Sequence, residues 1–379
     1  MAIKTFFSNI LNVVSFNQLP ENHRQITFYS EGPNYWSYIG GLLEAVLEHT
    51  DLHVCYICSS QNDPGLQIDH PRLNVFLTDE GFVRDWFFAN IDTRIMVMTM
   101  PDIGQYQVKR SKNDVHYIYV QHSLVSFHMV YRHGAFDYYD TIFCAGPHHL
   151  AEIRALEDEN NTSKKNLFNH GYARLDSIQA EAKLRGKTKK KQNSKRHYLL
   201  APSWGDNGMI ESGLGRKVVN QILNSGNFVT LRPHPQTVKF YPKMVQEIIS
   251  DNAKNSAFKY DKGVRGQDSL HESDVMICDW SGAALDYAFG LEKPVIFIDL
   301  TRKVNNPGYE KIPLIPFEVS IREKIGIVVS ATNIEEISLY DPKPLKPQIA
   351  DEYVYNVGNS DTVGAIEIVR ILDHLNAVR

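Results

Sequence analysis

Polar side chains that can bind ligands or transfer groups follow several apolar runs of this sequence, at the point where each run ends. Gln121, His122 and Ser123 close the run YIYVQHSL (117–124). The unperturbed pKa of an imidazole lies near neutrality, so His122 at the carboxyl end of a strand is well placed to act as a general base. A histidine at this position could instead simply cap a turn.

A second polar group lies in LRPHPQT (231–237), which presents Arg232 and His234. Each proline fixes its own φ angle and keeps the preceding residue out of the helical region, so we expect a stiff loop. A rigid loop that carries a guanidinium and an imidazole suits a phosphate ligand. A proline turn with exposed polar side chains is the alternative interpretation.

The stretch CDWSGAALD (278–286) places polar residues at the start of an alanine-rich helix. Asp279 and Ser281 stand at or near an N-cap, and Gly282 lets the backbone approach a ligand closely. The free N–H groups of the first helical turn then form an anion site. Asp279 would repel a phosphate, so we expect it to bind a sugar or glycerol hydroxyl; plain N-capping would need only one of these residues. Asp286 is expected to face solvent or an Arg/Lys partner.

An alternation of strand and helix patterns, which begins near residue 25, must position these residues. Continuous apolar runs bounded by polar turns are typical of parallel strands that are covered on both faces. The runs that predict strands are ITFYS (26–30), LHVCYIC (52–58), RLNVFL (72–77), RIMVMT (94–99), HYIYVQ (116–121), TIFCAG (141–146), HYLLAPS (197–203), NFVTLRPHP (227–235), FKY (258–260), DVMICD (274–279) and PVIFID (294–299). Helical patterns lie at 35–49, 80–91, 214–225, 238–251, 280–289 and 361–377. The fold class is therefore α/β.

A basic segment, KLRGKTKKKQNSKR (183–196), interrupts the alternation within the 379 residues. It is either a solvated linker or a patch that meets anionic lipid or polymer. We expect it to join two Rossmann-like, doubly wound domains, 1–182 and 197–379, with the last helix free to pack back on the first domain. A ligand should bind in the cleft where the carboxyl ends of both sheets face each other.

Composition and missing motifs exclude several classes of function. With 43% hydrophobic and 22% charged residues the chain is globular, and a formal net charge of −4 gives no support to nucleic-acid binding. The four cysteines (55, 58, 144 and 278) lie in apolar stretches, so we expect buried free thiols, which fits a reducing cytoplasm. The sequence contains no HExxH, GxSxG or GxxxxGK[ST] motif, and we expect no metal and no cofactor.

The first segment, MAIKTFFSNILNVVSF (1–16), is apolar but shorter than the ~18 residues of a spanning helix, and it is a poor signal peptide. Its apolar residues recur at helical spacing, so it either lies on a membrane surface or packs on the protein itself. Those residues are Phe6, Phe7, Ile10, Leu11 and Val14. We expect a cytoplasmic protein that is peripheral to the inner face of the cell membrane if this helix or the basic segment binds lipid.

The order of motifs resembles the CDP-glycerol glycerophosphotransferases of teichoic-acid and capsule synthesis. The motifs that carry the resemblance are VQHSL (120–124), GYARLD (171–176), LLAPSWGD (199–206), LRPHPQ (231–236) and SDVMICDWSGAALDYAFGLEKPVIFID (273–299). The resemblance covers roughly residues 110–300 and implies the two-domain GT-B fold. It also implies an enzyme that moves glycerol phosphate from CDP-glycerol, or from another nucleotide-activated donor, to a hydroxyl of a lipid-linked glycan or polyol-phosphate acceptor and releases CMP.

By motif, the family's two catalytic histidines fall on His122 and His234. The resemblance implies that the donor binds at Arg232, Ser203, Asp279, Ser281 and Gly282 and the acceptor at Gln121 and Ser123. His122 would be the general base, and Arg232 and His234 would neutralise the pyrophosphate. The family usually has W-H-G-T where this chain has QHSL, a second serine at position 282, and commonly a proline at 173. Two alternatives stay open: a GT-B glycosyltransferase that uses a UDP- or CMP-sugar, and a non-catalytic module that binds glycan or lipid surfaces.

Overall fold

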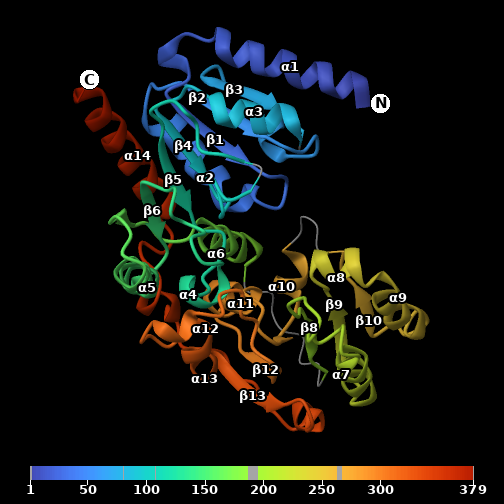
Figure 1. The fold of residues 1–379 in the computed structure, drawn as a ribbon. Helices are drawn as coiled ribbons and strands as arrows, with labels where there is room; N and C mark the ends of the chain where they lie inside the picture. Colours follow the sequence, from blue (N-terminus) through green and yellow to red (C-terminus); the bar gives the residue numbers. More distant parts are fainter. Residues whose placement is uncertain (1, 80, 107, 187–194, 263–266, 379) are drawn as a thin grey trace.

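The computed structural model describes residues 2–79, 81–106, 108–186, 195–262 and 267–378, and these form two halves, each built on a parallel sheet (Figure 1). The first sheet has seven strands in the order β3-β2-β1-β4-β5-β6-β7. Its strands are β1 (Ile26–Ser30), β2 (Val54–Cys58), β3 (Leu73–Leu77), β4 (Ile95–Met98), β5 (His116–Val120), β6 (Thr141–Cys144) and β7 (Asn166–Asn169). The helices of this half are α1 (Ala2–Gln18), α2 (Trp36–His49), α3 (Phe82–Asn90), α4 (Phe127–Val130), α5 (Pro147–Glu159) and α6 (Ala173–Arg185).

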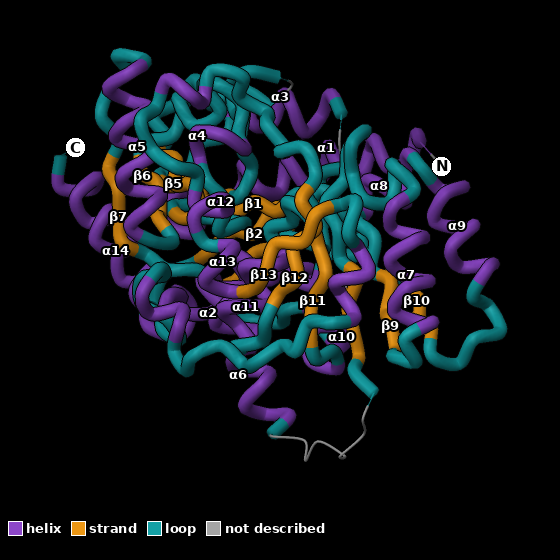
Figure 2. The backbone as a smooth tube through the Cα atoms, turned by 90° about the horizontal axis from the view of Figure 1, so that it is seen from below, coloured by secondary structure: helices purple, strands orange, loops and turns teal. Residues whose placement is uncertain are grey.

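The second sheet has six strands in the order β10-β9-β8-β11-β12-β13, and Figure 2 shows β11, β12 and β13 side by side. Its strands are β8 (His197–Leu200), β9 (Phe228–Leu231), β10 (Phe258–Tyr260), β11 (Val275–Cys278), β12 (Val295–Asp299) and β13 (Gly326–Ser330). The helices that follow are α7 (Leu214–Asn224), α8 (Pro235–Phe240), α9 (Pro242–Asp251), α10 (Asp268–Glu272), α11 (Ala283–Leu291), α12 (Phe317–Ser320), α13 (Arg322–Ile325) and α14 (Ser360–Ala377).

The strand sequences explain the layered arrangement. Every residue of β1 and β2 is buried, because helices cover both faces of a parallel sheet and leave no polar side. In each sheet the strand order reverses direction beside the first strand, between β1 and β4 and between β8 and β11. Ligands of doubly wound sheets bind at this switch point, outside the carboxyl ends of the strands. The predicted α/β fold of two Rossmann-like halves is confirmed.

The two halves share one apolar core through α6 and α11. Leu175 and Ile178 of α6 belong to the same buried cluster as Leu285 and Phe289 of α11. Gly290 allows the two helices to approach closely, since a Cβ there would lie 2.5 Å from the Ile178 side chain. The relative placement of the halves is therefore fixed by packing rather than by a single linker.

The final helix, α14, packs against α2 of the first half, and Figure 1 shows it beside that sheet. Ala365, Ile368, Ile371 and Leu372 of α14 join the core around α2. The basic segment begins inside α6, which ends at Arg185, and residues 187–194 lie outside the described residues. The division of the chain into domains at 183–196 stays a prediction.

Each run predicted to be a strand contains one, and the predicted helices are present, with the pattern at 238–251 divided between α8 and α9 at Pro242. Several elements were not predicted: the helices α4, α5, α6, α10, α12 and α13 and the strands β7 and β13. Strand β7 is only four residues long and has polar asparagines at both ends, so it lacks a continuous apolar run. Strand β13 follows a long irregular segment that hides its short apolar pattern.

The N-terminal helix α1 packs on the protein through one face and leaves another face exposed. Val13 and Phe16 are buried against the first half, where Phe16 packs on Phe76 and Phe87. The opposite face, which carries Phe6, Phe7, Ile10, Leu11 and Val14, is exposed. Among the described residues, no helix has the length and apolar character needed to cross a bilayer.

All four cysteines are buried free thiols. Cys55 and Cys58 lie within β2, and burial raises the pKa of each thiol to about 12. Neither thiol is therefore activated for redox exchange, as the sequence predicted.

Candidate active site

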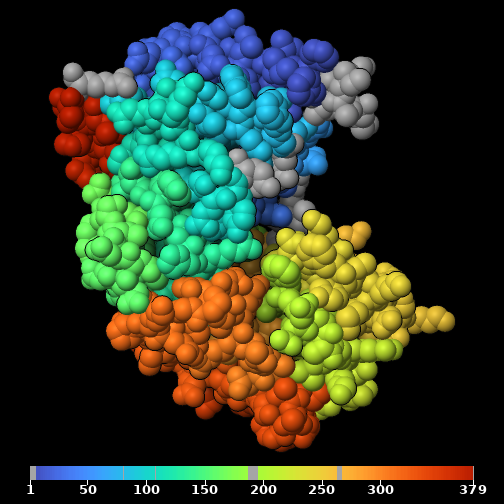
Figure 3. All heavy atoms as spheres, in the orientation of Figure 1, coloured from blue at the N-terminus to red at the C-terminus, as the bar shows by residue number. Residues whose placement is uncertain are grey.

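A cavity of about 610 Å³ lies between the two halves and is lined by residues that follow the carboxyl ends of strands in both sheets. Figure 3 shows the surface hollowed between the N-terminal half and the region of α8. The volume falls within the roughly 300–1,000 Å³ typical of ligand pockets. The cleft expected from the strand pattern is therefore present.

His122 follows β5 and lines this cavity. Its Nδ1 lies 2.8 Å from the hydroxyl of Tyr119. The ring centroids of Tyr35, Tyr38 and Tyr131 lie 6.1, 6.2 and 5.8 Å from the imidazole. Burial lowers the pKa of His122 to about 4, so the imidazole is neutral at pH 7 and has a lone pair with which to accept a proton.

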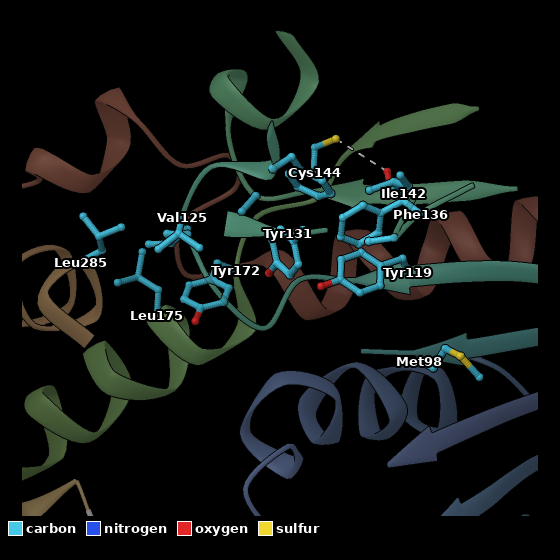
Figure 4. Close-up of a cluster of buried hydrophobic side chains, with 14 of the residues drawn as sticks. Met98, Tyr119, Val125, Tyr131, Phe136, Ile142, Cys144, Tyr172, Leu175 and Leu285 are labelled. Carbon is cyan, nitrogen blue, oxygen red and sulfur yellow. Dashed lines mark hydrogen bonds between the residues drawn. The ribbon is translucent and has the colours of Figure 1, made fainter. Parts of the chain in front are cut away.

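Tyr119 and Tyr131 belong to the buried hydrophobic cluster drawn in Figure 4. Phe136 packs against both Tyr119 and Tyr131, with ring centroids 4.8 and 4.9 Å apart. Burial raises the pKa of both phenols, which therefore stay protonated. Packing thus fixes the Tyr119 hydroxyl, and that hydroxyl orients the ring of His122.

His234 lines the opposite side of the cavity from the N-cap position of α8. Its Nδ1 accepts a hydrogen bond of 3.1 Å from the backbone N–H of Gln236. A neutral imidazole that accepts at Nδ1 carries its proton on Nε2, so Nε2 is the atom available as a donor. Burial and the nearby positive charge of Lys303 lower the pKa of His234 to about 4. The ring stacks on Trp204, with centroids 5.9 Å apart.

Arg232, Ser203, Ser281 and Gly282 line the same cavity from the second half, and Ser123 lines it from the first. The halves meet closely here, since a Cβ on Gly282 would lie 2.9 Å from the Ser123 Oγ. The structure thus brings the two histidines and these residues to one site, and their individual roles stay predictions.

Asp279 and Gln121 are not among the described residues that line the cavity, and their predicted ligand contacts stay predictions. Asp279 is 2% exposed, and its carboxylate accepts hydrogen bonds from the backbone N–H groups of Ser203 at 2.7 Å and Met209 at 3.4 Å. It therefore holds the loop after β8. Gln121 is 1% exposed, since successive side chains of an extended chain alternate and His122 takes the side that faces the cavity.

Sequence reasoning missed Arg174 and Lys303, which also line the cavity. Arg174 of α6 donates to Asp286 of α11 at 2.6 Å, so Asp286 has the arginine partner that was expected, and donates to Ser37 at 3.1 Å. Lys303 follows β12 and lies 4.6 Å above the ring of Trp204. The rule that polar residues collect after strands would have found Lys303, whereas the pairing of Arg174 with a residue 112 positions away needs the tertiary fold.

In the part of the chain that the structure describes, no group of three His, Cys, Asp or Glu side chains could hold a metal ion.

Residues 18–303 match the family described as CDP-glycerol:poly(glycerophosphate) glycerophosphotransferase. This chain belongs to that family. The match covers most of both sheets and includes both cavity histidines, so the family resemblance of the motifs is confirmed. The chain is accordingly a transferase of the CDP-glycerol-dependent type.

Solved structures share this fold over nearly the whole chain. The wall teichoic acid polymerase TagF is 10% identical, with a TM-score of 0.55, and the similarity covers 98% of this chain and 97% of that chain. The UDP-GlcNAc 2-epimerase of Methanocaldococcus jannaschii, in complex with UDP-GlcNAc and UDP, is 14% identical, with a TM-score of 0.59 over 92% of this chain and 99% of that chain. At these identities the likeness establishes the fold, which is of the GT-B type. Curated protein sequences give no significant match.

Proposed function

We propose that this protein transfers glycerol phosphate from CDP-glycerol to a hydroxyl of a lipid-linked acceptor and releases CMP. The observation that carries the proposal is that His122 and His234 line one cavity from opposite halves of a chain that belongs to the glycerophosphotransferase family.

In the proposed reaction, the acceptor hydroxyl oxygen attacks the phosphorus that carries glycerol. A new P–O bond forms to the acceptor, the bond to the bridging oxygen of the pyrophosphate breaks, and CMP leaves with that oxygen. His122 takes the hydroxyl proton, because burial keeps its imidazole neutral at pH 7 and a neutral imidazole can accept a proton. Phosphoryl transfer depends mainly on in-line positioning and charge stabilisation, and Tyr119 contributes to positioning by orienting His122.

Residues of the second half of the chain stabilise the negative charge that develops on the leaving group. His234 donates from Nε2, and Arg232 and Lys303 supply positive charge from the same cavity wall. Ser281 and Gly282 stand at the start of α11, where backbone N–H groups can approach a phosphate. Ser123 lies on the acceptor side, next to Gly282.

In this proposal, the exposed face of α1 binds the membrane surface in which the acceptor's lipid carrier lies. Phe7 is 61% and Leu11 66% exposed on that face, while the same helix is anchored through Phe16. An apolar helix face of this kind binds in the plane of the lipid headgroups. The variant Phe7→Glu/Leu11→Glu should lose cosedimentation with anionic vesicles and keep its turnover of a soluble acceptor. Leu339→Glu, which alters an 82% exposed leucine elsewhere, is the matched control.

The decisive experiment incubates the purified protein with CDP-glycerol, a UDP-sugar or a CMP-sugar, together with a glycan acceptor, and measures nucleotide release and thermal stabilisation. CDP-glycerol should stabilise the protein and give CMP only when the acceptor is present. Turnover of a nucleotide sugar instead would establish the glycosyltransferase alternative. Binding of glycan or vesicles without turnover of any donor would establish the non-catalytic alternative.

A further inference from the structure

The half of the cavity that surrounds His122 is lined by aromatic side chains. Four tyrosine rings, those of Tyr35, Tyr38, Tyr119 and Tyr131, lie within 6.2 Å of the imidazole, measured between ring centroids. The aromatic residues of this wall are Tyr35, Trp36, Tyr38, Tyr131 and Tyr172. An acceptor whose hydroxyl reaches His122 therefore lies next to aromatic side chains.

The indole of Trp36 packs directly against two glycines, Gly40 and Gly65. A Cβ on Gly40 would lie 2.4 Å from the indole, and a Cβ on Gly65 would lie 2.8 Å from it. Tyr56 packs edge-on against the same indole, with ring centroids 5.6 Å apart. The indole fits at this wall because positions 40 and 65 are glycines without side chains. The sequence therefore specifies the position of the ring.

The tyrosines offer neutral polar groups next to apolar faces. Burial raises the pKa of Tyr35, Tyr38 and Tyr131, which therefore remain phenols that can donate or accept a hydrogen bond. A sugar ring has the matching character, because apolar C–H groups alternate with hydroxyls around it. Aromatic rings with a polar tip suit such a ligand.

Charge is distributed unequally across the cavity. Among the described lining residues of the first half, Arg174 is the one Lys or Arg, and it is bound to Asp286 at 2.6 Å. The second half contributes Arg232 and Lys303. A phosphodiester chain carries one negative charge per repeat, and proteins recognise such anions through Lys and Arg. The wall around His122 supplies no such series of cations.

We propose that the aromatic wall is the acceptor subsite and that it receives a neutral sugar ring rather than the end of a glycerol phosphate chain. The inference rests on the proposed function, because His122 must be the base that faces the acceptor. It narrows the proposed function to the transfer of a single glycerol phosphate to each acceptor. The product ends in glycerol phosphate and no longer fits the wall, so the protein starts a chain and does not extend one.

The test supplies CDP-glycerol and two acceptors with the same apolar aglycone, a disaccharide and a tri(glycerol phosphate). CMP release should be at least a hundredfold faster with the disaccharide, and mass spectrometry should find one glycerol phosphate per acceptor. Faster transfer to tri(glycerol phosphate), or long products from the disaccharide, would overturn the inference and leave the proposed function intact. Failure to bind or turn over CDP-glycerol with either acceptor would overturn the proposed function, and the inference with it.

Substitutions in the aromatic wall test whether its residues bind the acceptor or only support the fold. Trp36→Ala should weaken disaccharide binding, measured calorimetrically with CMP present, by tenfold or more and leave CDP-glycerol affinity unchanged. Trp86→Ala, at a half-exposed tryptophan of α3, should change neither affinity. Should Trp36→Ala fail to fold, Tyr35→Ala replaces it, with Tyr106→Ala as control. Disaccharide affinity equal to that of the unmodified protein in the Trp36 or Tyr35 variant would contradict the proposal.

Discussion

Removal of the Asp286 carboxylate should destabilise the protein far more than removal of an ion pair on its surface. The Arg174 Nε lies 2.6 Å from the Asp286 Oδ2, and the two side chains are 15% and 8% exposed. Asp286→Ala leaves the guanidinium buried, and among the described residues the hydroxyl of Ser37 and the ring face of Tyr38 remain as its partners. Breaking a buried pair in this way costs about 3–5 kcal/mol, and the two remaining contacts put the expected loss at ~3 kcal/mol.

The assay is urea unfolding, with the midpoint and the slope both measured. Replacing both partners with apolar residues in Arg174→Met/Asp286→Leu should return the free energy of unfolding to within ~1 kcal/mol of the unmodified protein, because no charge is then left buried. Arg185→Ala is the surface control. It removes pairs with Glu181 and Asp268 from a 36% exposed arginine and should leave the urea midpoint nearly unchanged, because solvent screens exposed ion pairs. A loss for Asp286→Ala as small as the control's would refute a buried ion pair between the halves.

Three further predictions test the site. Burial depresses the pKa of His122 to about 4, so the imidazole becomes protonated only as the pH falls towards that value. We expect kcat/KM to stay level from pH 8 to pH 6 and to decrease once the pH is below about 5. A decrease in kcat/KM centred near pH 6.5 would contradict this prediction. Gly282→Ala puts a Cβ 2.9 Å from the Ser123 Oγ and should cost ~1–3 kcal/mol of unfolding free energy, most of it recovered in the double variant with Ser123→Ala; purely additive urea midpoints would contradict the close approach of the halves. Lys303→Met keeps the aliphatic chain over Trp204 and removes the charge, so calorimetry should find CDP-glycerol affinity reduced by ~10-fold or more, and unchanged affinity would place the pyrophosphate elsewhere.

The fold and the place of the site follow from the sequence because parallel strands leave a regular pattern. Continuous apolar runs identified the strands, and in a doubly wound sheet their carboxyl ends meet at one edge. His122, His234 and Ser281 each follow such a run, and all three line the same cavity. The position of these three residues relative to a strand end therefore predicted the edge of the sheet at which they lie.

The contacts of individual side chains could not be predicted in this way. Asp279 stands where a ligand-binding residue is expected, yet the loop after β8 needs an acceptor for two backbone N–H groups and takes its carboxylate. Gln121 lies next to His122 but points into the interior. The Arg174–Asp286 pair joins α6 to α11, and this meeting depends on how the halves pack. Such assignments need the tertiary structure because they depend on competition between partners that are distant in sequence.

The most direct test of the assigned roles compares His122→Ala with His234→Ala for CMP release and for CDP-glycerol affinity. His122→Ala should lower kcat by ~10²–10⁴ and leave donor affinity unchanged, because a general base acts on the acceptor hydroxyl. His234→Ala should lose both rate and donor affinity, because its Nε2 donates to the pyrophosphate. If His122→Ala loses donor affinity and keeps its rate at saturation, the two roles are reversed. If both variants keep full activity, neither histidine takes part in the reaction.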